Sequence, residues 1–406
     1  MGSEGRSWSG AAAVGGGVEG EAAIAAVVAP APGDVPASGA SVDIALPLPE
    51  MTPRIMRVPL IPSLLSLRIC FWDFVSFRFV LIDAFVSGWV RGICKELVSG
   101  WSSLDSSRFS IETVSGGITN MCESLPAPWQ FHLSNFVVSA EYGKGNKSSV
   151  TVRLYGPNTD LVIDRKRELQ AIPHLSAAGF GAQLLGTFEN GMVQSFIYAR
   201  TLTPSDMKEP RIAAEIAKEL RRFHQVDIPG SKEPQLWDDI FKFMKKASIL
   251  EFEDKEKQKR YETISFRKIQ DEVKELKLYF IDFEYGSYSY RGYDIANHFN
   301  EYAGYDCDYS LYPDKDSQYH FFRNYLQPDR PSEVQVQDLD ALYVETNTYR
   351  LASHIYWALW ALIQAKVSPI DFDYLGYFFL RYDEYKKQRE SCLSLAESSL
   401  SALKND

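Results

Sequence analysis

The chain has 406 residues, of which 45% are hydrophobic and 24% charged, an ordinary composition for a globular protein with one large domain or two modest ones. Its net charge of −10 argues against a nucleic-acid-binding protein, which needs a basic face to neutralise phosphates. The five cysteines are widely scattered, with no CxxC motif or Cys/His cluster, so we expect free thiols in a reducing compartment, the cytoplasm.

Residues 1–50 are rich in Ala, Gly and Pro and nearly lack aromatic residues. Such a segment cannot bury a core, and we predict a disordered tail. A transit peptide would be rich in Arg and poor in acids, whereas this segment holds one Arg and six acidic residues.

We expect a helical segment at residues 51–107, which contains the most hydrophobic part of the chain, residues 56–92. A membrane span needs about 20 nearly uncharged residues. Charged residues interrupt this stretch at Arg68, Asp73, Arg78 and Asp83. The stretch therefore predicts a buried or partner-facing helix, not a membrane helix.

Residues 108–202 are rich in strand patterns and contain one amphipathic helix at 160–179. The predicted strands are 108–114, 149–156 and 191–202. "GFGAQLLG" (179–186) resembles a dinucleotide fingerprint, but Leu184 stands where the last glycine belongs, so we predict a turn.

From residue 203 to 406 the patterns are mainly helical. The predicted helices are 210–226, 235–248, 252–276 and 336–366. A small β-rich part followed by a larger helical part predicts an α+β, two-lobed fold, with a cleft where the strand at 192–198 crosses between the lobes.

"YFIDFEY" (279–285) reads as an apolar strand that ends on Asp282, with Glu284 on the same face two residues later. In a two-lobed phosphotransferase, an aspartate at such a strand end holds Mg²⁺ against the nucleotide phosphates. A surface strand end or a cap is the alternative interpretation.

Other parts of a nucleotide site follow in the expected order. "SGGITN" supplies a phosphate-covering loop or a plain hairpin turn, with Ser115, Gly116, Gly117, Thr119 and Asn120 as candidates. Arg153 on a strand and Glu168 on the next helix predict an ion pair at the phosphates. The hinge that meets the adenine would be formed by Gln194, Phe196 and Ile197.

Five stretches, including "ETVSGGITN", "VTVRLYGPNTD" and "IDFEYGSYSYRGYDIANHF", resemble the choline/ethanolamine kinase family, most closely its plant ethanolamine kinases. The resemblance covers most of residues 108–390. It implies a protein-kinase-like fold, with ATP and Mg²⁺ as cofactors. It also implies phosphorylation of ethanolamine to phosphoethanolamine, the first step of the CDP-ethanolamine route to phosphatidylethanolamine.

The resemblance assigns the substrate pocket to Trp357, Trp360 and Tyr377, with Glu301 and Asn300 nearby. The two tryptophans are three residues apart and share a helical face, and their π faces attract an ammonium group. A plain aromatic core stripe is the alternative. A primary ammonium also needs acceptors for its N–H groups, which Asn300 and Glu301 could supply, so we expect ethanolamine in preference to choline.

The chain departs from the family where a catalytic loop resembling "HNDLLSGN" should precede "IDFEY". The preceding stretch, "KRYETISFRKIQDEVKELKLYF", contains neither His nor Asn, so no catalytic base is identifiable. Two segments, 56–92 and about 121–140, look like insertions, and we expect 121–140 to be poorly packed. A splice variant, a gene-model error or genuine divergence would each explain these departures.

Three hypotheses stay open: an ethanolamine kinase whose activity is impaired in this form, a pseudokinase that binds nucleotide or a kinase partner, and a small-molecule phosphotransferase of another family branch. Choline kinase activity is a further alternative. The expected partner is a small amino alcohol, without nucleic acid or membrane span. The oligomeric state is open, a homodimer included.

Overall fold

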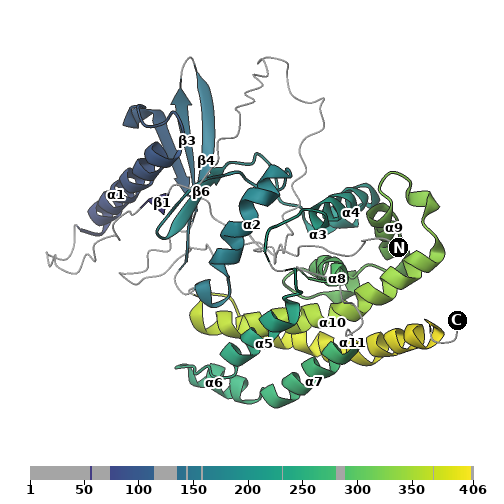
Figure 1. Cartoon of the computed structure of the whole chain (residues 1–406). Helices are drawn as coiled ribbons and strands as arrows, with labels where there is room; N and C mark the ends of the chain where they lie inside the picture. The colour runs from purple at the N-terminus through teal and green to yellow at the C-terminus, as the bar shows by residue number, and fades with distance from the viewer. Residues whose placement is uncertain are drawn as a thin grey trace.

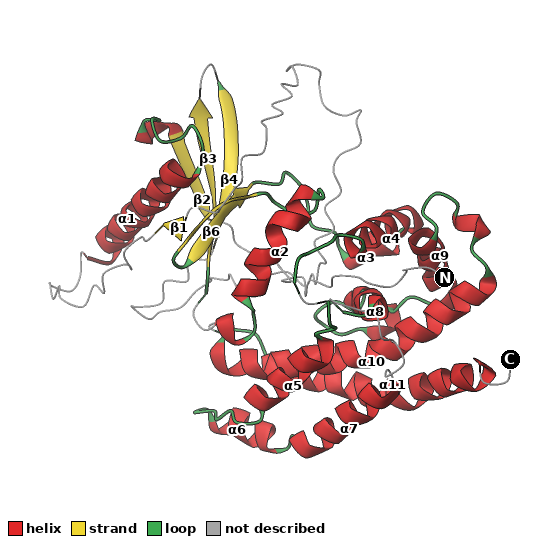
Figure 2. Ribbon diagram, viewed as in Figure 1, coloured by secondary structure: helices red, strands yellow, loops and turns green. Residues whose placement is uncertain are grey.

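The computed structural model describes residues 55–56, 74–113, 135–142, 145–156, 159–230, 232–279, 289–368 and 370–403. Within these residues the strands all lie in an N-terminal lobe whose last strand ends at Ser195, and the C-terminal lobe is built from helices (Figures 1 and 2). The expected α+β, two-lobed fold is confirmed.

The N-lobe contains a six-stranded sheet with the strand order β1-β5-β6-β4-β3-β2. Only the short edge pair β1–β5 is parallel; the other pairs are antiparallel. The strands are β1 (Ile55–Met56), β2 (Phe109–Thr113), β3 (Asn135–Tyr142), β4 (Asn146–Leu154), β5 (Leu184–Phe188) and β6 (Gly191–Ser195).

Helix α1 (Phe74–Leu97) lies along one face of this sheet (Figure 1). Its buried residues Val90 and Ile93 pack in one apolar cluster with Val138 and Val152 of the central strands. The part of the hydrophobic stretch 56–92 that packs in this cluster therefore belongs to a buried helix of the N-lobe core. Of the two predicted alternatives, a buried or a partner-facing helix, this is the first.

Two sequence predictions for the N-lobe were wrong. Residues 135–140, expected in a poorly packed insertion, begin strand β3, which pairs with β2 and β4 and buries Phe136, Val138 and Ala140. Residues 121–134 lie outside the described residues. In the predicted turn 179–186, Gly179 and Gly181 do have positive φ, but Leu184 already begins β5.

Helix α2 (Arg165–Ala177) is shorter than predicted because a 3-10 turn (Thr159–Leu161) occupies the start of the segment. Asp164 caps the helix by accepting a hydrogen bond from the Arg167 backbone N–H. After the helix, Gly179 adopts a φ of +86°, which favours glycine and ends the helix as expected.

Nine helices of the described residues form the C-lobe. They are α3 (Pro204–Lys208), α4 (Pro210–His224), α5 (Leu236–Ala247), α6 (Lys255–Glu262), α7 (Phe266–Tyr279), α8 (Arg291–Glu301), α9 (Lys315–Leu326), α10 (Val336–Val367) and α11 (Tyr374–Leu403).

Helix α10 is the central element of this lobe. Every residue from 346 to 359 is buried, and α5, α8, α9 and α11 pack around it (Figure 1). Because neighbouring helices surround this part of α10, its side chains, including polar ones such as Ser353, contact several of them.

The predicted helix 252–276 is two helices, α6 and α7, separated at residues 263–265. Tyr279, expected in the strand before Asp282, is the last residue of α7. The apolar spacing of Ile269, Val273 and Leu276, all buried, carries the helical period to this end. None of the described helices is long and apolar enough to span a membrane.

Candidate active site

The predicted ion pair of the N-lobe is present. Arg153 on β4 donates from Nη1 to Oε1 of Glu168 on α2 at 3.0 Å. Arg165 donates to the other carboxylate oxygen at 2.7 Å, so Glu168 has two arginine partners. Two guanidinium groups against one carboxylate leave a net positive charge, which suits a phosphate group. All three side chains are about one-fifth exposed, at 20, 18 and 17%.

Arg165 was not predicted as a site residue. Its guanidinium lies 4.2 Å from the ring centre of Tyr155 and donates to the Thr159 hydroxyl at 2.8 Å. The signal that could have found it was its position three residues before Glu168, which places both on one helical face.

The predicted hinge lies at the end of β6. Gln194 is still in the sheet, opposite Thr151, and the Phe196 N–H donates to the Ser149 carbonyl at 3.2 Å. Ile197 is 37% exposed, and from there the chain leaves the sheet for the C-lobe. These three residues thus lie on the connection between the lobes; contact with adenine stays a prediction.

The phosphate-loop candidates (Ser115, Gly116, Gly117, Thr119, Asn120) and the metal candidates (Asp282, Glu284) lie outside the described residues. Among the residues that the structure does describe, no group of three or more His, Cys, Asp or Glu side chains could hold a metal ion. The metal site thus stays a prediction made from the two carboxylates of "IDFEY".

The five predicted substrate residues come from three packed helices. Asn300 and Glu301 end α8, Trp357 and Trp360 lie on α10, and Tyr377 lies in the first turn of α11. The ring centres of Trp357 and Trp360 are 5.3 Å apart with a nearly perpendicular arrangement. Helices α8 and α11 both pack against α10, Asn300 donates to Ser353 of α10, and Glu301 interacts electrostatically with Tyr377. We call these five predicted residues the C-lobe cluster.

More aromatic rings extend this cluster. Tyr374 packs edge-on against Trp360 at 5.8 Å, and Phe372 lies 4.9 Å from Tyr374 and 6.0 Å from Tyr377. Tyr305 lies 6.3 Å from Tyr377. Sequence reasoning missed these three residues because their contacts depend on how the segments after α8 and before α11 fold against α10 and α11. Their π faces suit a cationic ligand.

Glu301 supplies negative charge beside these rings. Its side chain is 7% exposed, and burial raises the pKa of its carboxyl, an effect that the positive charge of Arg381 partly opposes. No hydrogen bond or ion pair joins this carboxylate to another of the described residues. A buried carboxylate without a direct cationic partner suits an ammonium ligand.

Three polar residues that the sequence did not suggest connect the cluster. Asn297 accepts a hydrogen bond from the Trp357 indole at 2.6 Å, and Ser353 donates to the same Asn297 oxygen at 2.9 Å. Arg381 donates to the Tyr377 hydroxyl at 3.2 Å and to the Ser353 hydroxyl at 3.1 Å. Each lies four residues from a predicted residue (Glu301, Trp357 or Tyr377), a helical spacing that could have revealed them.

Comparison with known proteins places these features in one family. A family model described as "Choline/ethanolamine kinase" matches residues 111–279 and 274–386. The two matched segments meet at 274–279, the end of α7, where the sequence lacks the expected catalytic loop.

The chain is 52% identical to "Probable ethanolamine kinase" of Arabidopsis thaliana, over 91% of this chain and 94% of the relative. It is 34% identical to "Probable ethanolamine kinase A" of Dictyostelium discoideum, over 75% of this chain and 93% of the relative. Among solved structures, Plasmodium vivax ethanolamine kinase is similar with a TM-score of 0.59 and 27% identity, over 72% of this chain and 86% of that chain. Choline kinase from Cryptosporidium parvum (TM-score 0.55, 22% identity, 76% and 96% coverage) shares the fold.

Proposed function

The chain belongs to the choline/ethanolamine kinase family, and from that premise we propose that it is an ethanolamine kinase whose turnover is impaired by the loss of one loop. The reaction would transfer the γ-phosphoryl group of ATP to the hydroxyl of ethanolamine. The observation that carries the proposal is the C-lobe cluster, in which buried Glu301 interacts electrostatically with Tyr377, and the rings of Trp357 and Trp360 contact each other.

In this proposal the C-lobe cluster binds the ammonium end of the substrate. The rings of Trp357 and Trp360 attract the cation, each by about 0.5–2 kcal/mol depending on desolvation. The Glu301 carboxylate neutralises the charge and accepts N–H hydrogen bonds. A primary ammonium needs such acceptors, whereas a quaternary one does not, so the cluster favours ethanolamine over choline.

The N-lobe would bind the nucleotide. Arg153 and Arg165 lie on either side of the Glu168 carboxylate, and we assign Arg153 to the nucleotide phosphates with Glu168 orienting it. Asp282 and Glu284 are the residues of this chain that would hold Mg²⁺, since their carboxylate oxygens are the hard donors it prefers. When bound, Mg²⁺ would neutralise charge on the β- and γ-phosphates.

The chemical step needs a group that takes the proton of the attacking hydroxyl. As the new O–P bond forms and the bond to the ADP oxygen breaks, that proton must leave, and general-base help is typically worth about 10²- to 10⁴-fold. The stretch before Asp282 contains no His or Asn and continues α7 to Tyr279. We therefore assign this chain weak Mg·ATP binding and negligible turnover, which keeps a nucleotide- or partner-binding pseudokinase as the second candidate function.

The test is repair of the chain. A loop resembling "HNDLLSGN", with its flanking residues, is inserted between Leu276 and Tyr279, and phosphoethanolamine formation is measured from ATP and ethanolamine. The repaired chain should turn over and the 406-residue chain should not. Asp282→Asn in the repaired chain should abolish turnover again. Robust turnover by the unrepaired chain would overturn the assignment of the chemistry to the missing loop.

The cytoplasm stays part of the proposal. Its support is that Cys94, Cys307 and Cys392 of the described residues are free thiols, as a reducing compartment would maintain them.

A further inference from the structure

The hydrogen bonds around Ser353 form one connected chain across three helices. Asn297 of α8, Ser353 of α10 and Arg381 of α11, here called the polar relay, join the two sides of the C-lobe cluster. At one end the relay holds Trp357 through Asn297, and at the other it holds Tyr377 through Arg381. Ser353 is fully buried and Arg381 is 2% exposed, so water cannot replace these bonds freely.

Chemistry alone decides the direction of each bond. The Trp357 indole and the Arg381 guanidinium can only donate. Because the indole donates to Oδ1 of Asn297, that oxygen is an acceptor, and the single hydroxyl hydrogen of Ser353 must point to it. The Ser353 oxygen is then left to accept, from Arg381 Nη2 at 3.1 Å and from Nδ2 of a fourth residue, Asn300, at 3.0 Å.

The relay therefore fixes which end of the Asn300 amide is free. Its NH₂ group is used on Ser353, and its carbonyl oxygen is buried without a hydrogen-bond partner among the described residues. Asn297, Asn300 and Glu301 are spaced by three and four residues, so they share one face of α8. A free amide oxygen thus accompanies the Glu301 carboxylate on that face.

An unused buried acceptor favours a ligand that brings its own donor. Leaving such an acceptor unsatisfied is costly, and a primary ammonium has three N–H donors, whereas a quaternary ammonium has none. If the amide were free to rotate, its NH₂ group could face the ligand instead, and that group would repel a cation. The orientation of Asn300 thus decides whether this residue discriminates between the two ligand classes.

We propose that Ser353, held by Asn297 and Arg381, is a specificity-determining positioning residue that keeps the Asn300 oxygen available to a primary ammonium and so makes the site prefer primary over quaternary amino alcohols. The inference rests on the proposed function, because it takes the C-lobe cluster as the amino alcohol site. It assigns no chemical step to Ser353, which acts through Asn300.

The test compares Ser353→Ala with a matched control, Thr348→Val. Both remove a buried hydroxyl from α10, but the Thr348 hydroxyl donates to the Val344 carbonyl one turn earlier and has no link to the relay. The dissociation constants of ethanolamine and of choline are measured by calorimetry on the full chain. Ser353→Ala should weaken ethanolamine binding about tenfold and choline binding much less, so that the selectivity ratio falls about tenfold. Thr348→Val should leave the ratio unchanged.

A double-variant cycle separates positioning from general packing. Asn300→Leu should lower the selectivity ratio as Ser353→Ala does, and the double variant should lose no more selectivity than Asn300→Leu alone. Asn300→Leu also tests the proposal independently should Ser353→Ala fail to fold. Equal weakening of both ligands, or an unchanged ratio, in either folded variant would overturn the inference while leaving the proposed function standing. Failure of the unaltered chain to bind ethanolamine would overturn the proposed function and the inference with it.

Discussion

Arg167 of α2 donates to the carboxylate of Asp239 on α5 at 2.8 Å, which ties a helix of the N-lobe to a helix of the C-lobe. Arg167 is 38% exposed, so solvent screening limits what the pair contributes to the free energy of unfolding. The pair matters more for positioning α2 than for stability, because the next residue, Glu168, forms the ion pair with Arg153.

We expect Arg167→Ala to lower the free energy of unfolding by less than about 1 kcal/mol but to loosen α2. In the repaired chain, Mg·ATP binding should weaken about threefold, since Glu168 would no longer be held at one distance from Arg153. Calorimetry measures Mg·ATP binding, and hydrogen exchange of the α2 amides measures how firmly the helix is held. Lys218→Ala, which removes an exposed pair with Glu215 within α4, is the control. Unchanged exchange in α2 would show that the inter-lobe pair does not hold the helix.

Trp357 should affect the amino alcohol and not the nucleotide. In the repaired chain, Trp357→Ala should weaken ethanolamine binding by about 2- to 30-fold, the range of one cation–π contact, while Mg·ATP binding stays the same. Trp357→Phe loses the indole donor to Asn297 but keeps a π face. Its loss of ethanolamine affinity should therefore be smaller than that of Trp357→Ala. A parallel loss of nucleotide affinity in Trp357→Ala would contradict the site assignment.

The pH dependence of ethanolamine binding should follow Glu301. Burial raises the pKa of this carboxyl above its usual value, and the groups that face it are Arg381, Tyr377, Tyr305 and Cys307. Binding needs the carboxylate, so affinity should be full above the raised pKa and be lost as the pH falls through it. Titrations between about pH 4 and pH 8 check this. Glu301→Gln should bind ethanolamine weakly, and its affinity should not fall further at low pH.

The contribution of Glu301 to the free energy of unfolding should depend on pH in the opposite direction to ethanolamine binding. A carboxyl whose pKa is higher in the folded state than in the unfolded state binds its proton more tightly when folded, so it favours folding at low pH and opposes it once both states are ionised. Glu301→Gln should therefore raise Tm at neutral pH while it weakens ethanolamine binding. A lower Tm together with lost binding would indicate that Glu301 is a structural residue.

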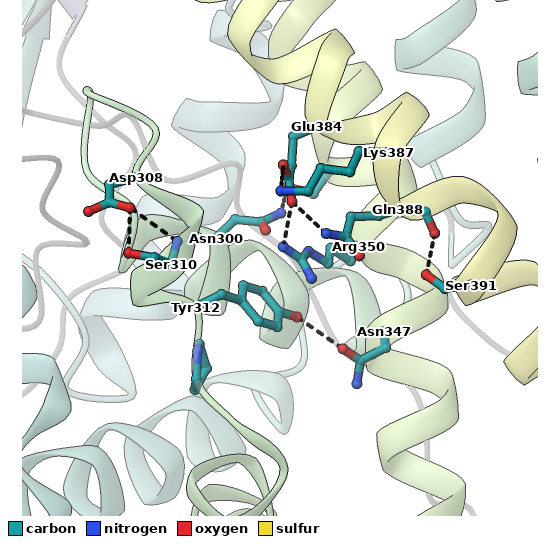
Figure 3. Close-up of polar contacts among 12 residues, drawn as sticks. Asn300, Asp308, Ser310, Tyr312, Asn347, Arg350, Glu384, Lys387, Gln388 and Ser391 are labelled. Carbon is teal, nitrogen blue, oxygen red and sulfur yellow. Dashed lines mark hydrogen bonds and ion pairs between the residues drawn. The ribbon is translucent and has the colours of Figure 1, made fainter.

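Arg350 on α10 and Glu384 on α11 form a buried ion pair, in which each charge depends on the other for compensation. Figure 3 shows Arg350 reaching the Glu384 carboxylate, with an N···O distance of 3.2 Å, and Gln388 donating to the same group at 2.7 Å. The Tyr312 ring centre lies 3.6 Å from the guanidinium carbon.

Glu384→Leu should cost about 3–5 kcal/mol, because it leaves Arg350 buried without its counter-charge. The double variant Arg350→Met/Glu384→Leu should recover most of that loss. The urea midpoint of unfolding measures both, with Lys387→Ala, whose side chain is 71% exposed, as a control expected to change little. A double variant no more stable than Glu384→Leu would show that the uncompensated charge of Arg350 is not the source of the loss.

The sequence by itself determined the two-lobed order of elements, the ion pair of Arg153 and Glu168, and the shared helical face of Trp357 and Trp360. Each of these depends on local periodicity or on a motif order that the chain carries in one dimension. The absence of His and Asn from residues 259–280, just before Asp282, is likewise a fact of the sequence.

Only the tertiary structure decided that residues 135–140 belong to a central strand, because a strand's partners are set by pairing with β2 and β4 and not by its own residues. The same holds for the polar relay. Asn297, Ser353 and Arg381 lie on three helices, and only the packing of these helices brings their side chains within hydrogen-bonding distance. Local patterns specify which face of a helix is buried, whereas the partner it meets there is decided by how the helices pack.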